Sequence, residues 1–292
     1  MSGTTPRGAP AVVALLCLIW GSTWLVIQGG LRDLPPLTAL AGRFGIAALV
    51  LLLVAPHLHR LERGERPTWR EVLFHGWLCS ALPLGIVYVC ELVIPSGLTS
   101  LIWGVYPLLV AGLSRVLLPE EKLRASQWLG FAGAFGGLCV LFATDLRDLG
   151  ANAIAMAALL LLSPLSSATG TLLLKRRSHG TSSILLNRDG LCLAAATVGL
   201  AALLFEREAP VRWTSGALAS VLYMGFVATV LAFTLYYWLL RTVPANQLAL
   251  ISYVTPLIAL GLGACFAGEP LHLHTLVGAA LILGGILAAR RR

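Results

Sequence analysis

The sequence has very little charge for its length. Asp, Glu, Lys and Arg make up only 12% of its 292 residues, which is about half their share in an average soluble domain. Hydrophobic residues make up 58%, and the mean hydropathy is +0.85. They occur in long blocks, and a helix that is apolar on every side needs apolar surroundings. The composition therefore excludes an ordinary soluble fold and indicates a chain that lies in lipid.

The chain also lacks the motifs of membrane-embedded enzymes and of metal sites. No GxSxG, HExxH or CxxC sequence occurs, and the apolar blocks contain essentially one histidine, His75. The cysteines all fall inside apolar blocks, where a thiol is usually a small buried hydrophobe. We therefore expect no enzyme activity, cofactor, metal or disulfide. The net charge of +8 does not indicate nucleic acid, because the arginines sit in short loops between apolar blocks.

Ten charge-poor segments are long enough to cross a membrane as helices. A spanning helix needs roughly 20 mostly apolar residues, whereas a barrel strand has only about ten residues of alternating polarity. Only helices and closed barrels satisfy the backbone inside lipid. The sequence therefore predicts an all-α integral membrane protein with ten transmembrane helices. We expect them at 10–30, 35–56, 71–91, 93–116, 125–144, 150–174, 183–205, 214–240, 244–267 and 272–289.

The basic residues predict the orientation of the chain. Lys and Arg collect in cytoplasmic loops, and an N-terminus in the cytoplasm places most of them there. The outer side would then carry only Arg32, Arg147, Arg207 and Arg212. We expect both termini in the cytoplasm. The cytoplasmic set is Arg7, Arg60, Arg63, Arg66, Arg70, Arg115, Lys122, Arg124, Lys175, Arg176, Arg177, Arg241, Arg290, Arg291 and Arg292.

The two halves of the sequence align with each other. At an offset of 149 residues, for example, Pro107 falls on Pro256 and Glu120 on Glu269. We therefore expect a first repeat at 1–146 and a second at 147–292, each with five helices. Because five is odd, the second repeat would be inverted in the membrane. Inverted repeats are typical of secondary transporters, in which the substrate site lies near the midplane between the repeats.

The sequence resembles the EamA-type branch of the drug/metabolite transporter superfamily over nearly its whole length. The first helix reads LIWGSTWLVIQ from Leu18, and the second reads PLTALAGRFGIAALVLL from Pro36 with an Arg-Phe step. A proline, a glutamate in a short loop and a glycine-rich helix follow one another twice. These segments are YPLLVAGLSRVLLPEEKLRASQWLGFAGAFGGLCVL from Tyr106 and TPLIALGLGACFAGEPLHLHTLVGAALILGGIL from Thr255.

The resemblance implies an exporter of small metabolites, most of all amino acids, in the bacterial inner membrane. Aromatic or hydrophobic amino acids are among the candidate substrates, and the expected partners are a small-molecule substrate and the lipid bilayer. A single chain with both repeats can form the whole site, so a monomer can function. A flippase for a lipid-linked substrate stays open as an alternative. A membrane-embedded enzyme, a channel or a receptor is disfavoured.

Aromatic residues deep inside the predicted spans are candidates for a substrate cavity. Trp20, Trp103, Ser163 and Tyr253 lie about 9–13 residues into their spans, too deep for the usual interfacial belt. Neighbours three or four residues away share a helix face with them. The alternative role for each is helix packing. The candidate substrate-binding set is Trp20, Ser22, Thr23, Trp24, Trp103, Tyr106, Ser163 and Tyr253, and Gln247, Ser252 and Thr255 could add neutral hydrogen bonds.

Four prolines are candidate hinges, and a pair of tyrosines are candidate gates. A proline inside a helix frees a carbonyl and kinks the helix, which suits either a hinge or a static bend. Tyr88 and Tyr237 occupy matching positions in the two repeats, near opposite membrane surfaces. We predict them as paired gates, with plain interfacial tyrosines as the alternative. The prolines inside spans are Pro83, Pro107, Pro164 and Pro256.

Arg43 is a charge inside the second span, which by default is a functional hypothesis. It could bind a substrate carboxylate, or it could be structural, pairing with Glu91 or capping carbonyls. The resemblance favours the structural role, because the family carries an arginine there whatever its substrates. No Asp or Glu lies near any midplane. We therefore expect transport to follow the substrate gradient or to be coupled only weakly to protons.

Overall fold

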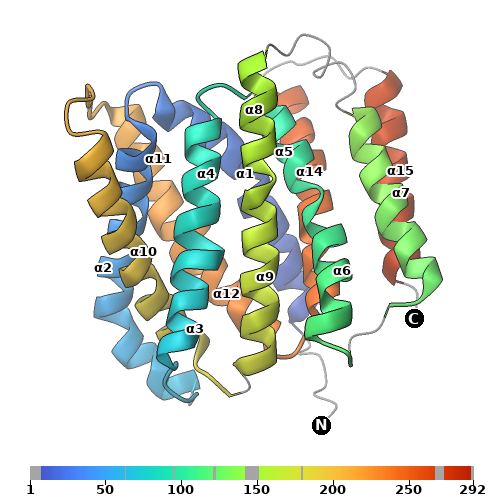
Figure 1. Cartoon of the computed structure of the whole chain (residues 1–292), viewed down its shortest axis with the longest axis horizontal. Coiled ribbons are helices and arrows are strands. Elements are labelled where there is room, and N and C mark those ends of the chain that lie inside the picture. Colours follow the sequence, from blue (N-terminus) through green and yellow to red (C-terminus); the bar gives the residue numbers. More distant parts are fainter. Residues whose placement is uncertain are drawn as a thin grey trace.

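The computed structural model describes residues 8–62, 64–94, 96–120, 123–141, 151–178, 180–266 and 273–290. These residues form a bundle of upright helices (Figure 1). We call the top of Figure 1, where α1 ends and α2 begins, the upper end of the bundle. Helix α1 begins and α15 ends at the opposite, lower end. The unbroken helices are α1 (Ala9–Leu31), α2 (Pro36–Glu62), α7 (Ala125–Leu141), α10 (Ser183–Phe205) and α15 (Leu273–Arg290).

The other helical stretches are interrupted. Two contain a π segment, in which the helix is wider by one residue per turn. Short breaks divide the other three. The π-containing stretches are α3 (Trp69–Leu73), η1 (Phe74–Ala81) and α4 (Leu82–Cys90), and α11 (Ser215–Gly225), η2 (Phe226–Leu231) and α12 (Ala232–Leu240). The divided ones are α5 (Ser96–Trp103) with α6 (Tyr106–Leu117), α8 (Ala151–Leu160) with α9 (Leu162–Arg177), and α13 (Ala245–Ala249) with α14 (Ile251–Phe266).

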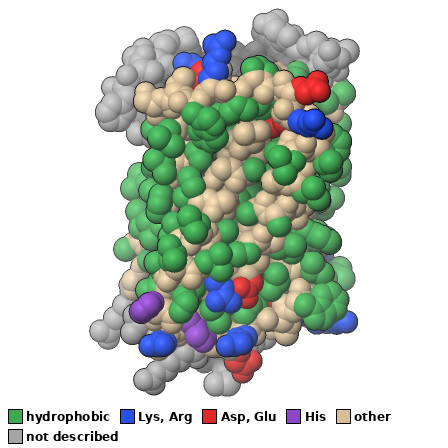
Figure 2. All heavy atoms as spheres, turned by 90° about the vertical axis from the view of Figure 1, so that its left-hand side faces the viewer, with side chains coloured by type: hydrophobic (Ala, Val, Ile, Leu, Met, Phe, Trp, Pro, Cys, Tyr) green, Lys and Arg blue, Asp and Glu red, His purple; other side chains and the backbone are tan. Residues whose placement is uncertain are grey.

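The described chain has seven helical segments that are long and apolar enough to cross a membrane. Large hydrophobic side chains on these helices are exposed, including Leu53, Leu203 and Phe205. Figure 2 shows hydrophobic side chains over the middle of one face and charged side chains towards its two ends. The protein is therefore a multi-pass membrane protein. The seven segments are Ala9–Leu31, Pro36–Arg60, Trp69–Cys90, Thr99–Leu117, Ile154–Arg177, Ser183–Phe205 and Ser215–Leu240.

The four predicted prolines all lie within helical stretches. Pro83 is the second residue of α4, directly after the π segment η1, and Pro107 is the second residue of α6, directly after the short break that follows α5. Pro164 lies two residues after the start of α9, which follows the break at Leu161, and Pro256 lies inside α14. A proline at each of these places removes one helix N–H donor. Three of the four coincide with a π segment or a short break, and their role as hinges stays a prediction.

Helices α2 and α10 pack along each other and cap each other at both ends. At the upper end, Glu206 accepts hydrogen bonds from the N–H groups of Leu37 (2.8 Å) and Thr38 (2.7 Å), at the start of α2. At the lower end, Glu62 accepts from the hydroxyls of Ser182 and Ser183, at the start of α10. Each carboxylate thus satisfies helix N–H groups that have no partner within their own helix.

Glu62 also joins a third helix to this pair. Its carboxylate accepts a hydrogen bond from Arg241, directly after α12, at 2.9 Å. Burial alone would raise the pKa of Glu62, but the hydrogen bonds from Ser182 and Ser183 outweigh it and lower that pKa below its usual value. Glu62 is therefore a carboxylate at neutral pH, as its contacts require.

Candidate functional site

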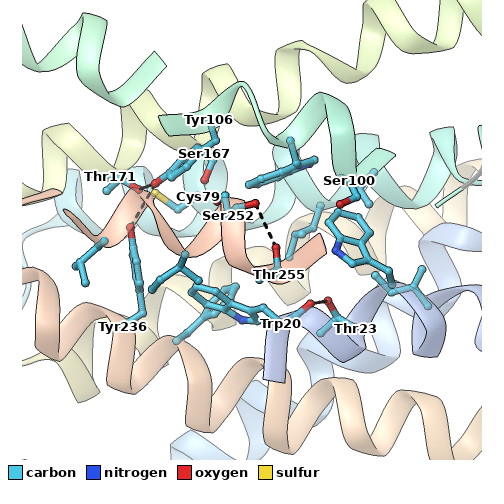
Figure 3. A pocket seen from close by; sticks show the side chains of 18 of the residues that line it. Trp20, Thr23, Cys79, Ser100, Tyr106, Ser167, Thr171, Tyr236, Ser252 and Thr255 are labelled. Atoms are coloured by element: carbon cyan, nitrogen blue, oxygen red, sulfur yellow. Dashed lines mark hydrogen bonds between the residues drawn. The ribbon is translucent and has the colours of Figure 1, made fainter. Parts of the chain in front are cut away.

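A cavity lies inside the bundle among helices of both halves of the chain. Its volume is about 140 Å³, and it is partly open to the outside. Its walls combine indole and phenol rings with hydroxyl groups (Figure 3). Pockets of such mixed character hold small organic molecules.

Five of the eight predicted substrate-binding residues line this cavity. Helix α1 contributes Trp20, Thr23 and Trp24, α5 contributes Trp103, and α6 contributes Tyr106. They reach one cavity because they share helix faces, as their spacing predicted. Trp103 and Tyr106 stack with their ring centroids 5.8 Å apart. Ser252 and Thr255 also line the cavity, whereas Gln247 is outside its lining.

Three predicted residues point elsewhere. Ser22 lies 2.6 Å from the hydroxyl of Tyr223 on α11. Ser163 donates to the carbonyl of Pro83 at 2.8 Å, and the Tyr253 hydroxyl donates to the carbonyl of Phe131 at 2.9 Å. All three side chains tie one helix to another. Their position along the helix was suitable, but they face neighbouring helices instead of the cavity.

At the end of the cavity towards the bottom of the bundle, the hydroxyl groups bond to one another. The Tyr106 hydroxyl donates to Thr171 at 3.1 Å and lies 3.3 Å from that of Tyr236. The indole of Trp20 packs on Tyr236, with ring centroids 5.4 Å apart, and its N–H points to the carbonyl of Ala228 at 3.5 Å. We call Tyr106, Thr171 and Tyr236 the closed cluster, because their hydroxyls partner each other.

Other polar groups of the cavity lining have no partners in the described part of the chain. These are the indole N–H groups of Trp24 and Trp103 and the hydroxyl of Ser100. Figure 3 shows Ser100 and Thr23 at one end of the cavity and Thr171 and Tyr236 at the other. Buried polar groups normally have partners, so these three indicate a place for a bound molecule.

Arg43 also lines the cavity, and its side chain is only 3% exposed. Its Nε donates to the Thr229 hydroxyl at 2.8 Å, and Thr229 in turn donates to the carbonyl of Met224 at 2.8 Å. Thr229 lies in η2, so the π segment holds the guanidinium in place. The guanidinium also lies near the hydroxyl of Tyr88.

Pairing of Arg43 with Glu91 was the wrong alternative. Both carboxyl oxygens of Glu91 are buried and have no hydrogen-bond partner among the described residues. Burial raises the pKa of Glu91, which directly follows the third span, to about 8. Glu91 is therefore mostly protonated at neutral pH, which explains how an unpaired carboxyl can remain buried.

The two predicted gate tyrosines differ in their surroundings. Tyr237 lines the main cavity and also a second, much smaller one of about 20 Å³, which lies towards the lower end beside Lys175 and Arg241. Its ring packs against His75 at a centroid distance of 4.5 Å. Tyr88 is buried and lies outside the lining of both cavities. The four prolines lie outside the cavity linings too.

Sequence reasoning missed several residues of the lining. Ser167 and Thr171 follow Ser163 at intervals of four along α9, and this stripe was a usable signal. Tyr236 precedes the predicted Tyr237, and both face the cavity. Cys79, Ser100 and Phe233 had no signal beyond their depth in a span. Other missed lining residues are Ile27, Leu84, Val87, Leu248 and Ile251.

Comparison with known proteins agrees with this architecture. The model of the EamA-like transporter family matches residues 9–143 and again residues 154–291. The chain is 30% identical over 267 residues to "Uncharacterized inner membrane transporter YedA" of Escherichia coli (strain K12), covering 88% of this chain and 82% of that protein. It is 26% identical over 274 residues to "Uncharacterized transporter YoaV" of Bacillus subtilis (strain 168), covering 92% of each.

Two further similarities concern function and fold. The chain is 27% identical over 286 residues to "Probable amino-acid metabolite efflux pump" of Salmonella typhimurium, covering 93% of this chain and 91% of that protein. A solved crystal structure superposes with a TM-score of 0.80 at 20% identity, covering 97% of this chain and 96% of the other. That likeness establishes a shared fold.

Proposed function

The chain belongs to the EamA-like transporter family, and from that premise we propose that it exports small metabolites, amino acids above all, across the inner membrane. The observation that carries the proposal is the cavity, whose aromatic and hydroxyl lining comes from both halves of the chain. Such a lining suits an amphipathic molecule with an apolar or aromatic side chain. The name of the Salmonella relative supports amino-acid metabolites, and that of YedA supports the inner membrane.

We propose that transport proceeds by alternating access between two inverted repeats of five helices each, 1–146 and 147–292. Two matches to one family model in a single chain support the repeat. The reciprocal caps of α2 and α10 support its inversion, because each helix is held at its start by the end of the other. The ten helical stretches would then all span the membrane, with both termini in the cytoplasm.

In this cycle Tyr237 is the proposed lower gate, since it separates the main cavity from the smaller one. Tyr88 is its proposed counterpart near the upper end, where it adjoins Arg43. The π segment before Pro83, the short breaks before Pro107 and Pro164, and α14 at Pro256 are the proposed hinges. One chain contains all of these parts, so we propose that the monomer is functional.

Growth assays test the exporter role. Cells that express the protein should tolerate otherwise toxic concentrations of some amino acids or their analogues. Trp20→Ala and Trp103→Ala should abolish this tolerance, whereas Trp69→Ala, on an indole 68% exposed and remote from the cavity, should preserve it. Tolerance that survives both cavity substitutions would reject the proposed site, and no tolerance to any amino acid would reject the substrate class.

Coupling is tested in proteoliposomes. No Asp or Glu is among the described residues that line the cavity, so we propose that transport follows the substrate gradient or is coupled only weakly to protons. Counterflow of a substrate found in the growth assay should proceed without a pH gradient. Strict dependence on an imposed gradient would contradict this mode of transport.

A further inference from the structure

We infer that the part of the cavity lined by Arg43, Trp24, Ser100 and Trp103, which we call the Arg43 end, is a carboxylate-binding subsite. The subsite requires an acidic group on the substrate and does not require an amino group. The inference rests on the proposed transport function and narrows its substrate class. Its basis is the chemical kind of these polar groups. Trp24, Ser100 and Trp103 have no hydrogen-bond partner among the described residues. Arg43 contacts only neutral groups there, the hydroxyls of Thr229 and Tyr88.

The unpartnered groups are hydrogen-bond donors. An indole nitrogen can only donate, and a hydroxyl can donate to any acceptor that faces it. Trp24 Nε1, Trp103 Nε1 and Ser100 Oγ are all buried without a partner. Such donors cost stability unless something accepts their hydrogen bonds. A carboxylate, which is acceptor-only and binds several donors at once, satisfies this requirement.

These donors lie at a common depth with the cavity's cation. Arg43 lies seven residues after the start of α2, Trp24 seven before the end of α1, and Trp103 seven after the start of α5. All three helix termini are at the upper end of the bundle, so each residue lies about 10 Å below it. Because all three residues also line one cavity, the acidic group of a molecule bound at this depth would lie level with the guanidinium and the indole N–H groups.

The charge of Arg43 is not neutralised by any described acid. Its Nε donates to the neutral Thr229 and its guanidinium lies beside the neutral Tyr88 hydroxyl, and the described lining of the cavity contains no carboxylate. A cation in lipid needs a partner, and a guanidinium suits a carboxylate in particular. The absence of an acid from that lining also means that a substrate ammonium would find no counter-ion there.

Arg188 provides a matched control for this assignment. It also lies inside a span, in α10, but it pairs with its neighbour Asp189 at 2.6 Å and lies outside the cavity lining. Its charge therefore already has a partner. Replacing either arginine by glutamine removes one charge from one intramembrane helix, and only Arg43 faces the cavity.

The experiment measures binding of small probes to the purified protein by quenching of its tryptophan fluorescence. Each probe series consists of a free amino acid, its N-acetyl form and its amide. The first series is phenylalanine, N-acetyl-phenylalanine and phenylalaninamide, and leucine and valine provide two more series. We expect both acids of a series to bind and the amide to bind at least about tenfold more weakly. Arg43→Gln should weaken binding of the acids by about tenfold to a hundredfold. Arg43→Lys should weaken it less, and Arg188→Gln should leave it unchanged.

The outcomes separate this inference from the transport proposal. Amides that bind as well as acids, or acids that need their amino group, would overturn the carboxylate subsite while leaving the transporter intact. No binding of any probe, together with no export in the growth assay, would reject both. Melting temperatures in detergent report whether each variant folds. If Arg43→Gln does not fold, the preference of the wild-type protein for acid over amide still decides the matter.

Discussion

The two ends of the cavity differ in how their polar groups are satisfied. At the closed cluster, three hydroxyls from α6, α9 and α12 bond to one another. At the Arg43 end, three donors face the cavity without described acceptors, and the cation Arg43 has only neutral partners among the described residues. Polar side chains therefore bond to one another in the closed cluster, whereas at the Arg43 end they are available to bind a ligand. The difference between the two roles is whether another side chain of the protein accepts their hydrogen bonds.

The largest expected effect on ligand binding comes from introducing a carboxylate side chain at the Arg43 end. Ser100→Asp places a carboxylate in the cavity that Arg43 lines, where it would act as a counter-ion for Arg43 and repel an acidic ligand. Binding of N-acetyl-phenylalanine should fall by at least about a hundredfold, because two like charges in one buried site cost several kcal/mol. Ser100→Ala, which removes one donor only, should cost less than about tenfold. Equal losses in the two variants would show that Ser100 acts through packing.

A smaller effect is expected at the closed cluster. Tyr106→Phe keeps the ring that stacks on Trp103 but removes the hydroxyl that bonds to Thr171 and Tyr236. The free energy of unfolding should fall by about 1 kcal/mol, while ligand affinity changes by less than about threefold. Thermal melting with and without N-acetyl-phenylalanine measures both quantities. A tenfold loss of affinity would mean that this end also contacts the ligand.

The smallest effect on binding is expected at Glu91, near the Arg43 end but outside the cavity lining. Because burial raises its folded-state pKa to about 8, the folded protein keeps a proton that the unfolded chain loses above its ordinary pKa of about 4.3. Stability should therefore fall as pH rises between these values, by at most about 1.4 kcal/mol per pH unit.

Glu91→Gln removes that titration and should leave ligand affinity at pH 7 unchanged. The melting temperature of the variant should exceed that of the wild type by a margin that grows from pH 5 to pH 8 and then levels off. A margin that stays constant with pH would mean that the carboxyl is already ionised at neutral pH and has a partner.

The sequence predicted the helices well and the cavity only in part, for a physical reason. Apolar run length reports where a chain can cross lipid, and seven of the ten expected ranges agree to within several residues with helical segments long and apolar enough to cross a membrane. Residue depth in a span gives height in the membrane but no direction around the helix. Trp20 and Trp24 share one face and both reached the cavity, whereas Ser163 and Tyr253, at similar depth, face neighbouring helices.

Other features depend on packing between distant segments and leave no local pattern. The π segment that holds Thr229 against Arg43 follows from contacts between α2 and η2. Similarly, nothing near Ser100 in the sequence indicates that its hydroxyl lacks a partner. Recognition groups of this kind become visible only when every buried donor is matched with its acceptor.

The reciprocal caps of α2 and α10 restrict how the bundle can move. A displacement of one helix along the other would pull Glu206 from the start of α2 and Glu62 from the start of α10 at the same time. A tilt of the pair as a unit would preserve both sets of hydrogen bonds. The two helices therefore favour a rocking motion of paired helices and oppose elevator-like sliding. A crosslink between α2 and α10 should accordingly be tolerated through the whole transport cycle.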